Sequence, residues 1–158
     1  TGPRTQRREI LMTMVFINLP ASDLNRSRAF YTALGGTINP LFSDENAICV
    51  VWSDQIHFMV LRREYFATFT DKEIVDPATS AQTLIGFSRD SRAEVDAAAR
   101  AGLASGGTEP KTAQDYGFMY SRTLADPDGN VVEFVYMEPE AAERGPDAYM
   151  EEQGGGDS

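Results

Sequence analysis

Residues 126–137 read DPDGNVVEFVYM, which is a tight turn followed by a strand. The run of Asp, Pro, Gly and Asn predicts the turn, because glycine reaches positive φ and the short polar side chains bond nearby backbone amides. From Val131 onward the side chains alternate between two faces, and one face carries Glu133 among apolar residues. A glutamate on a largely apolar strand is costly to bury without a partner, so Glu133 is a candidate pocket residue.

The chain before this turn predicts a strand, a helix and a further strand. Residues 83–88 are apolar and short, as in a strand. Ser91 and Glu94 form a capping-box signal, and apolar residues at helical spacing continue the helix to two glycines at 106–107. Residues 118–124 predict the strand that pairs across the turn with the one described above.

The first half of the chain repeats this order. Residues 14–19 predict a buried strand, Ser22 or Asp23 offers a helix cap, and two glycines at 35–36 end that helix. Three strands are expected after it, at residues 37–42, 47–52 and 55–61. Asp23 and Asp90 lie 67 positions apart at equivalent places, so the pattern indicates an internal duplication.

We therefore expect a single folded domain at residues 12–138. It divides into a first module at about 12–62, a linker at about 63–81 and a second module at about 82–138. Residues 1–11 are expected to be an upstream extension or a cloning remnant. Residues 139–158 are expected to be an acidic flexible tail without a regular element, because residues 138–158 hold seven acidic residues against one basic residue and end in glycines.

The composition excludes several classes of protein. Among 158 residues there is one cysteine, Cys49, and one histidine, His57, which excludes an intramolecular disulfide and any site that takes two histidines from one chain. A net charge of −10 disfavours nucleic-acid binding, which depends on Lys and Arg. No apolar run approaches the roughly 20 residues of a membrane span. We expect a cytoplasmic protein with no nucleic-acid or membrane partner.

Two motifs in register with the duplication resemble the vicinal oxygen chelate superfamily, the glyoxalase, bleomycin resistance and extradiol dioxygenase group. They are DLxRSxxFYxxLG at residues 23–35 and DPDGNxxE at residues 126–133. The resemblance implies an α+β fold of two tandem βαβββ modules that form a curled mixed sheet cup. It also implies a small-molecule pocket on the concave sheet face and a homodimer.

The resemblance also identifies four positions that hold metal ligands in metal-dependent relatives. Here they carry Phe16, His57, Leu84 and Glu133. Phe16 and Leu84 cannot bind a metal, so the facial triad of an iron dioxygenase is excluded and no complete metal site is expected. A divalent metal held weakly by His57 and Glu133 is the alternative.

Six residues are predicted to contact a ligand: Phe16, Asn18, His57, Leu84, Tyr120 and Glu133. His57 and Glu133 are also the candidate catalytic pair, since a carboxylate raises the pKa of an imidazole toward neutral pH. The other interpretations are a histidine satisfied by a core neighbour, a glutamate facing solvent, and a Tyr120 that packs in the core beside a surface arginine. Trp52, Phe66 and Phe69 suit either a pocket wall or a dimer interface.

Three functions fit these residues. The first is an unassigned small-molecule pocket of the glyoxalase type without a stable metal, whether catalytic or only binding. The second is a glyoxalase-type lyase or isomerase, in which Glu133 removes a proton next to a carbonyl while His57 or a weakly held cation stabilises the enolate. The third is a drug-sequestering resistance protein of the bleomycin-binding type, which needs no catalytic residue.

Overall fold

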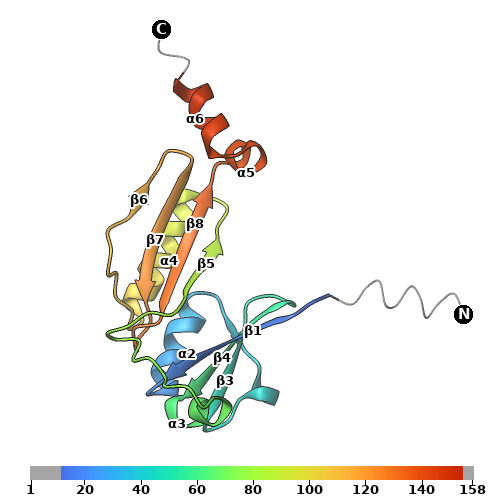
Figure 1. Ribbon diagram of the computed structural model, residues 1–158, viewed down its shortest axis with the longest axis vertical. Coiled ribbons are helices and arrows are strands. Elements are labelled where there is room, and N and C mark those ends of the chain that lie inside the picture. Colours follow the sequence, from blue (N-terminus) through green and yellow to red (C-terminus); the bar gives the residue numbers. More distant parts are fainter. Residues whose placement is uncertain (1–11, 155–158) are drawn as a thin grey trace, which may run out of the picture. The chain divides into compact units, whose positions relative to one another are not determined.

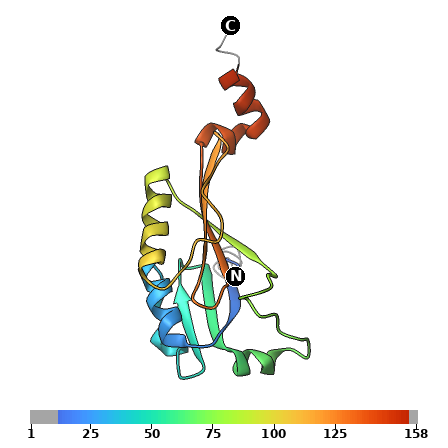
Figure 2. The same cartoon turned by 90° about the vertical axis from the view of Figure 1, so that its left-hand side faces the viewer.

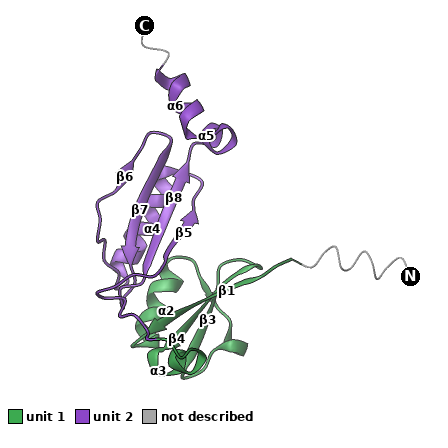
Figure 3. Ribbon diagram, viewed as in Figure 1, with its two compact units in different colours: residues 1–72 green, residues 73–158 purple. Residues whose placement is uncertain are grey.

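The computed structural model describes residues 12–154, which fall into two compact units. Unit 1 comprises residues 1–72 and unit 2 comprises residues 73–158 (Figure 3). The boundary lies inside the stretch predicted as a linker, at residues 63–81. Each unit contains one four-stranded sheet and one long helix, and each is described here by itself.

Unit 1 is built on a mixed sheet with the strand order β1-β4-β3-β2 (Figure 1). Its elements are β1 (Val15–Ala21), α2 (Leu24–Ala33), β2 (Thr37–Ile38), η1 (Pro40–Phe42), β3 (Ala47–Val51), β4 (Ile56–Arg62), α3 (Arg63–Phe66) and η2 (Ala67–Phe69). β1 runs parallel to β4, and the other pairs are antiparallel. The strand predicted at residues 37–42 is shorter than expected, because a 3₁₀ turn begins at Pro40, which has no backbone N–H for a sheet.

Unit 2 repeats this topology with the strand order β5-β8-β7-β6. Its elements are β5 (Leu84–Ser88), α4 (Arg92–Ala104), β6 (Gln114–Asp115), β7 (Met119–Ala125), β8 (Val131–Met137), α5 (Pro139–Arg144) and α6 (Pro146–Gly154). β5 is parallel to β8, as β1 is to β4. The predicted α+β class with two tandem βαβββ modules is thereby confirmed.

Side-chain caps start both long helices where the sequence predicts them. The carboxylate of Asp23 accepts hydrogen bonds from the backbone amides of Asn25 and Arg26 at the start of α2. At α4 the Ser91 hydroxyl accepts from the Glu94 amide, and the Glu94 carboxylate accepts from the Asp90 amide. The caps satisfy amides that have no partner inside a helix and so fix where each helix begins.

In each unit the long helix covers one face of the sheet, which we call the helix face (Figure 2). In unit 1 the Tyr31 ring of α2 meets the Phe58 ring of β4 edge to face at 5.5 Å. In unit 2 the fully buried Val95 and Ala99 of α4 belong to the same core as Phe134 of β8. The opposite side of each sheet is called the open face, and the polar candidates His57 and Glu133 lie there by strand alternation.

The expectation of a C-terminal stretch without a regular element is wrong for residues 139–154, which form α5 and α6. Pro139 stands in the first turn of α5, where its missing N–H costs nothing. Ala141 of α5 is buried, and Arg144 forms an ion pair with Glu152 at 3.0 Å. Residues 1–11 and 155–158 lie outside the described residues. No helix within the described residues is long and apolar enough to cross a membrane.

Candidate functional site

Phe16 and His57 lie next to one another on the open face of unit 1. They are register partners on the parallel strands β1 and β4, and their rings stack with centroids 4.7 Å apart at 17°. His57 is only 8% exposed, and its Nδ1 atom has no hydrogen-bond partner within the described part of the chain. A buried ring nitrogen without a partner is costly, so Nδ1 of His57 has an unused capacity to form a hydrogen bond.

Asn18 continues this open face two residues further along β1, beside Met59 of β4. Its side-chain amide nitrogen donates a long hydrogen bond of 3.4 Å to the Phe16 carbonyl. No hydrogen bond to its side-chain oxygen is found among the described residues, and the residue is exposed. Asn18 therefore offers a polar group at the place where the open face becomes concave.

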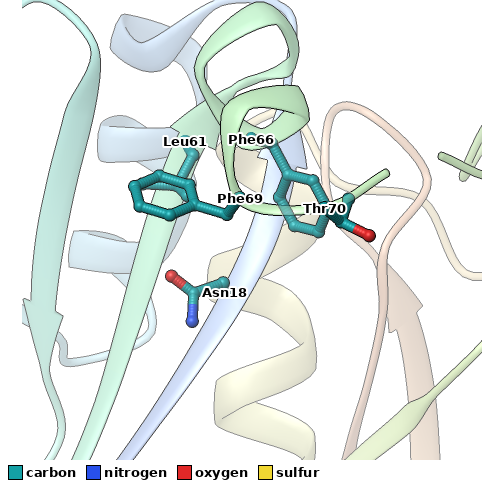
Figure 4. A pocket seen from close by; sticks show the side chains of 5 residues that line it. All are labelled: Asn18, Leu61, Phe66, Phe69 and Thr70. Atoms are coloured by element: carbon teal, nitrogen blue, oxygen red, sulfur yellow. The ribbon is translucent and has the colours of Figure 1, made fainter. Parts of the chain in front are cut away.

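A concave space opens from Asn18 toward α3 and η2. The side chains of Asn18, Leu61, Phe66, Phe69 and Thr70 enclose about 400 Å³ (Figure 4). An adjoining space of about 460 Å³ shares Asn18, Leu61 and Phe69 and reaches the η1 region. Its other lining residues are Leu41, Phe42, Ser43, Asp44, Ala47, Met59 and Tyr65. We call the two spaces together the aromatic groove, and each has the size of a site for a small organic molecule.

The walls of the aromatic groove are held by local contacts. The Tyr65 and Phe69 rings meet edge to face at 5.0 Å on one wall. On the other wall the Ser43 hydroxyl donates to the Asn39 carbonyl and accepts from the Cys49 amide. The Asp44 carboxylate accepts from the amides of Asn46 and Ala47. These contacts hold the two walls on either side of a floor of sheet side chains.

Only part of this groove is predictable from the sequence. Asn18 is one of the predicted ligand contacts, and the sequence suits Phe66 and Phe69 either to a pocket wall or to a dimer interface. The structure places both rings in the groove wall. Asp44 and Thr70 were missed, because nothing in a loop sequence shows that it folds over the open face. A usable signal was the strand alternation that puts Leu61 on the same face as His57.

Glu133 occupies the centre of the open face of unit 2. Its register partners are Gly86 on β5 and Thr123 on β7. The side chain is half-buried, and its carboxylate has no hydrogen bond or ion pair with any described residue. Leu84 lies on the same face two residues along β5 and is 64% exposed. Leu84 and Glu133, which are both predicted to contact a ligand, therefore lie on the same face of the unit 2 sheet.

Tyr120, predicted to contact a ligand, lies on the helix face of unit 2. Its hydroxyl donates a 2.6 Å hydrogen bond to the Asp96 carboxylate of α4, and this bond raises the pKa of the phenol. The Arg122 guanidinium binds the same carboxylate at 3.1 Å. This placement separates Tyr120 from the open face that carries Glu133 and agrees with the other interpretation, an aromatic residue packed beside an arginine.

Only two of the four family ligand positions carry side chains that can bind a metal, and these two belong to different units. His57 belongs to unit 1 and Glu133 to unit 2, and the other two positions hold the hydrocarbon side chains of Phe16 and Leu84. Within residues 12–154 no group of three or more His, Cys, Asp and Glu side chains could hold an ion. The donor set present in either unit therefore does not fit the metal of the metal-dependent relatives.

Comparison with known proteins agrees with this fold. The family described as bleomycin resistance protein-like N-terminal matches residues 13–53. No curated protein matches the chain. Among solved structures, a glyoxalase/bleomycin resistance protein/dioxygenase family enzyme from Burkholderia phytofirmans PsJN is 18% identical, with a TM-score of 0.66 over 80% of this chain and 99% of that one.

Two other solved structures extend the comparison. A glyoxalase-related enzyme from Fulvimarina pelagi is 19% identical, with a TM-score of 0.68 over 80% of this chain and 88% of that one. TnmS3, an antibiotic binding protein from Streptomyces sp. CB03234, is 17% identical, with a TM-score of 0.56 over 81% of this chain and 98% of that one. The fold and the N-terminal match together confirm the predicted resemblance to the vicinal oxygen chelate superfamily.

Proposed function

We propose that this chain binds a small, mainly apolar organic molecule in the aromatic groove of unit 1. The observation that carries the proposal is the first space of this groove, about 400 Å³, which is lined by Leu61, Phe66 and Phe69 with Asn18 and Thr70 as its polar groups. A space of this size and lining, with few polar groups, is typical of ligand sites. The same scaffold supports many chemistries, so the fold alone does not identify the ligand.

The side chains around the groove supply both driving force and orientation. Phe69 is 66% exposed and Phe42 is 66% exposed, so a ligand that covers them removes apolar surface from water. Their rings can also stack on a flat ligand. The unpartnered Nδ1 of His57 lies on the same open face, two residues along β4 from Met59 of the groove. We therefore expect His57 and Asn18 to orient the polar end of the ligand.

Truncation of Phe69 is expected to weaken binding of N-phenyl-1-naphthylamine, a neutral fluorescent aromatic probe. Loss of one stacking wall should raise the dissociation constant by about tenfold, equivalent to about 1.4 kcal/mol. The measurement is a fluorescence titration of the unchanged chain and of Phe69→Ala. Tyr116→Ala is the control, since Tyr116 is an exposed aromatic of unit 2 outside the groove.

The titration decides the proposal because each result has one meaning. Saturable binding that falls in Phe69→Ala but not in Tyr116→Ala supports the groove. No saturable binding, or equal affinities in all three proteins, overturns it. Mass spectrometry of small molecules that co-purify with the folded protein then identifies the natural class of ligand. A parallel titration with a cationic glycopeptide antibiotic tests the sequestering role, which is rejected if binding does not saturate.

A glyoxalase-type lyase or isomerase is the second candidate, and the half-buried carboxylate of Glu133 without a partner is the observation that favours it. A glutamate side chain in such a position is suited to remove a proton from carbon next to a carbonyl. We expect Glu133→Gln to lower deuterium incorporation into dihydroxyacetone in D₂O by about 10²-fold or more, measured by NMR. The measurement is made with and without added Ni²⁺, Zn²⁺, Mn²⁺ or Fe²⁺. This function is rejected if the unchanged chain exchanges deuterium no faster than Glu133→Gln under any of these conditions.

We also propose that the chain forms a homodimer. β1 is an edge strand of its sheet and exposes Val15 and Phe16, which are 46% and 51% exposed. Exposed apolar residues on an unpaired strand edge favour association with another chain. Light scattering after size exclusion gives the mass directly, and a single species of 17.4 kDa would contradict the dimer.

A further inference from the structure

The second space of the aromatic groove, the one of about 460 Å³, carries an acidic group that the first space lacks. Asp44 lines the second space, and none of the described residues that line either space is Lys, Arg or His. A ligand group that enters there therefore meets a carboxylate with no competing cation in the lining. The net charge of −10 acts in the same direction, because it attracts cations and repels anions.

The Asp44 carboxylate is held in place by the backbone and keeps capacity for a ligand. Its Oδ1 atom accepts hydrogen bonds from the amides of Asn46 and Ala47 at 2.8 and 3.1 Å. Within the described residues the side chain makes no further hydrogen bond and no ion pair. Asp44 is exposed, so a ligand can reach its Oδ2 atom. An exposed carboxylate attracts a cation only weakly by itself, so the rest of the lining decides which kind of cation fits.

Three aromatic residues line the second space together with Asp44: Phe42, Tyr65 and Phe69. The Tyr65 and Phe69 rings meet at 77° with centroids 5.0 Å apart, so their planes form a corner. Phe42 and Phe69 are each 66% exposed, which leaves ring surface open to a ligand. The face of an aromatic ring carries negative charge density, and such rings therefore attract a cation as the carboxylate does.

We propose that the second space binds a methylated ammonium group of the groove's ligand, in addition to the polar end that faces His57 and Asn18. Because this assignment rests on the proposed function, it narrows the ligand there to an organic cation. A quaternary ammonium has no N–H donor and contacts rings through its methyl groups, which suits a lining of carbon surface with one carboxylate. A primary ammonium is strongly hydrated and needs acceptors for three N–H donors.

The two spaces are placed so that one molecule can occupy both. They share Asn18, Leu61 and Phe69 as lining residues. Phe66 belongs to the first space only, and Asp44 belongs to the second space only. A ligand with an aromatic body in the first space can therefore extend a methylated ammonium group to Asp44 in the second space.

The test is a titration of the ¹⁵N-labelled chain with phenyltrimethylammonium chloride, followed by amide chemical shifts. tert-Butylbenzene is the neutral ligand of the same shape, and sodium chloride controls for ionic strength. We expect both organic ligands to give saturable shifts at residues 42–44 and 65–70, and sodium chloride to give none. Saturable binding of tert-butylbenzene without binding of phenyltrimethylammonium overturns the assignment of the cation and leaves the proposed function standing. Binding of neither ligand overturns both.

Asp44→Asn separates the charge from the shape of the side chain, because an asparagine oxygen still accepts from the amides of residues 46 and 47. We expect this variant to weaken binding of the cation by about three- to fivefold and to leave the affinity for tert-butylbenzene unchanged. Glu45→Gln is the matched control, since Glu45 is an adjacent exposed carboxylate that does not line the groove. Equal losses of cation affinity in the two variants, or equal losses for the two ligands in Asp44→Asn, overturn the assignment.

Phe42→Leu tests the aromatic part of the site, because leucine keeps an apolar side chain and removes the ring. We expect the affinity for phenyltrimethylammonium to fall about threefold further than the affinity for tert-butylbenzene. Tyr116→Leu is the control, since Tyr116 is an exposed aromatic residue of unit 2, and neither affinity should change in it. If Phe42→Leu lowers both affinities equally, the ring contributes apolar surface alone and recognition of a cation by the rings is rejected.

Discussion

Gly129→Ala is expected to destabilise unit 2 by about 2–4 kcal/mol, a large share of the stability of a small domain. Gly129 has a φ of +108°, a conformation that strains any residue with a Cβ. The Cβ would also overlap the backbone carbonyl of Pro77 and lie 2.9 Å from the Ala78 Cα. Strain and overlap add at this one position, which is why the expected loss exceeds that of an ordinary glycine substitution.

The turn cannot move to relieve the overlap. The buried Asp126 carboxylate accepts hydrogen bonds from the amides of Asp128, Gly129 and Asn130 at 2.9, 3.0 and 2.9 Å. Three bonds to one oxygen hold the backbone in place, and breaking them would leave buried polar groups without partners. The turn leads directly into β8, so its displacement would also disturb the strand that carries Glu133.

Urea unfolding of the unchanged chain and of Gly129→Ala measures this effect. Gly106→Ala is the matched control, since Gly106 lies in the same unit and has a φ of +97°. A Cβ at Gly106 would meet only the Cγ atom of Pro127, at an ordinary contact distance of 3.5 Å. The control should lose about 1 kcal/mol from strain alone. Equal losses in the two variants would show that the contact with residues 77–78 adds nothing.

Local signals made the fold predictable from the sequence. The DPDGN turn, the caps at Asp23 and Ser91 and the period-two strands each depend on residues close in sequence. Because the same order of strands and helix recurs in both modules, the pattern in one module supports the interpretation of the other. β6, with two residues, carries no such pattern, and this explains why it was not predicted.

The aromatic groove was beyond sequence reasoning for a different reason. Its walls come from residues 40–44 and residues 63–70, and the contacts that bring them over the sheet are made in the folded unit. Strand alternation predicts that Asn18 and Leu61 share a face with His57, but not what covers that face. The placement of Tyr120 on the helix face was not predictable for a similar reason, since its partner Asp96 lies on a helix 24 positions earlier in the chain.

Arg122→Met is expected to destabilise unit 2 by about 2–4 kcal/mol at pH 7. The guanidinium binds both carboxylate oxygens of Glu109 at 2.9 Å and the Asp96 carboxylate at 3.1 Å. The Arg122 side chain is 18% exposed, so water compensates little when the cation is removed. Methionine preserves the apolar stem, and the loss therefore reports on the two carboxylates left without their partner.

The pH dependence separates this ion-pair effect from a loss of packing. Hydrogen bonds from Tyr120 and Arg122 lower the pKa of the Asp96 carboxyl despite its partial burial. A lowered folded-state pKa contributes stability above the unfolded-state value of about 3.9, and that contribution is lost as the pH falls through the folded-state pKa. The difference in the free energy of unfolding between the unchanged chain and Arg122→Met should thus be largest at pH 7 and should decrease below about pH 4.

Arg92→Met is the control for an arginine in an exposed ion pair of the same unit. Its pair with Asp115 at 2.7 Å has side chains 38% and 56% exposed, so the expected loss is at most about 1 kcal/mol. Urea unfolding of the three proteins at pH 7 and pH 3 gives the loss of unfolding free energy for each of the two variants at each pH. If Arg122→Met loses no more stability than Arg92→Met, the contacts of Arg122 with Glu109 and Asp96 contribute no more than a surface ion pair does. If its loss is the same at both pH values, the stabilisation comes from the stem of the side chain and not from its charge.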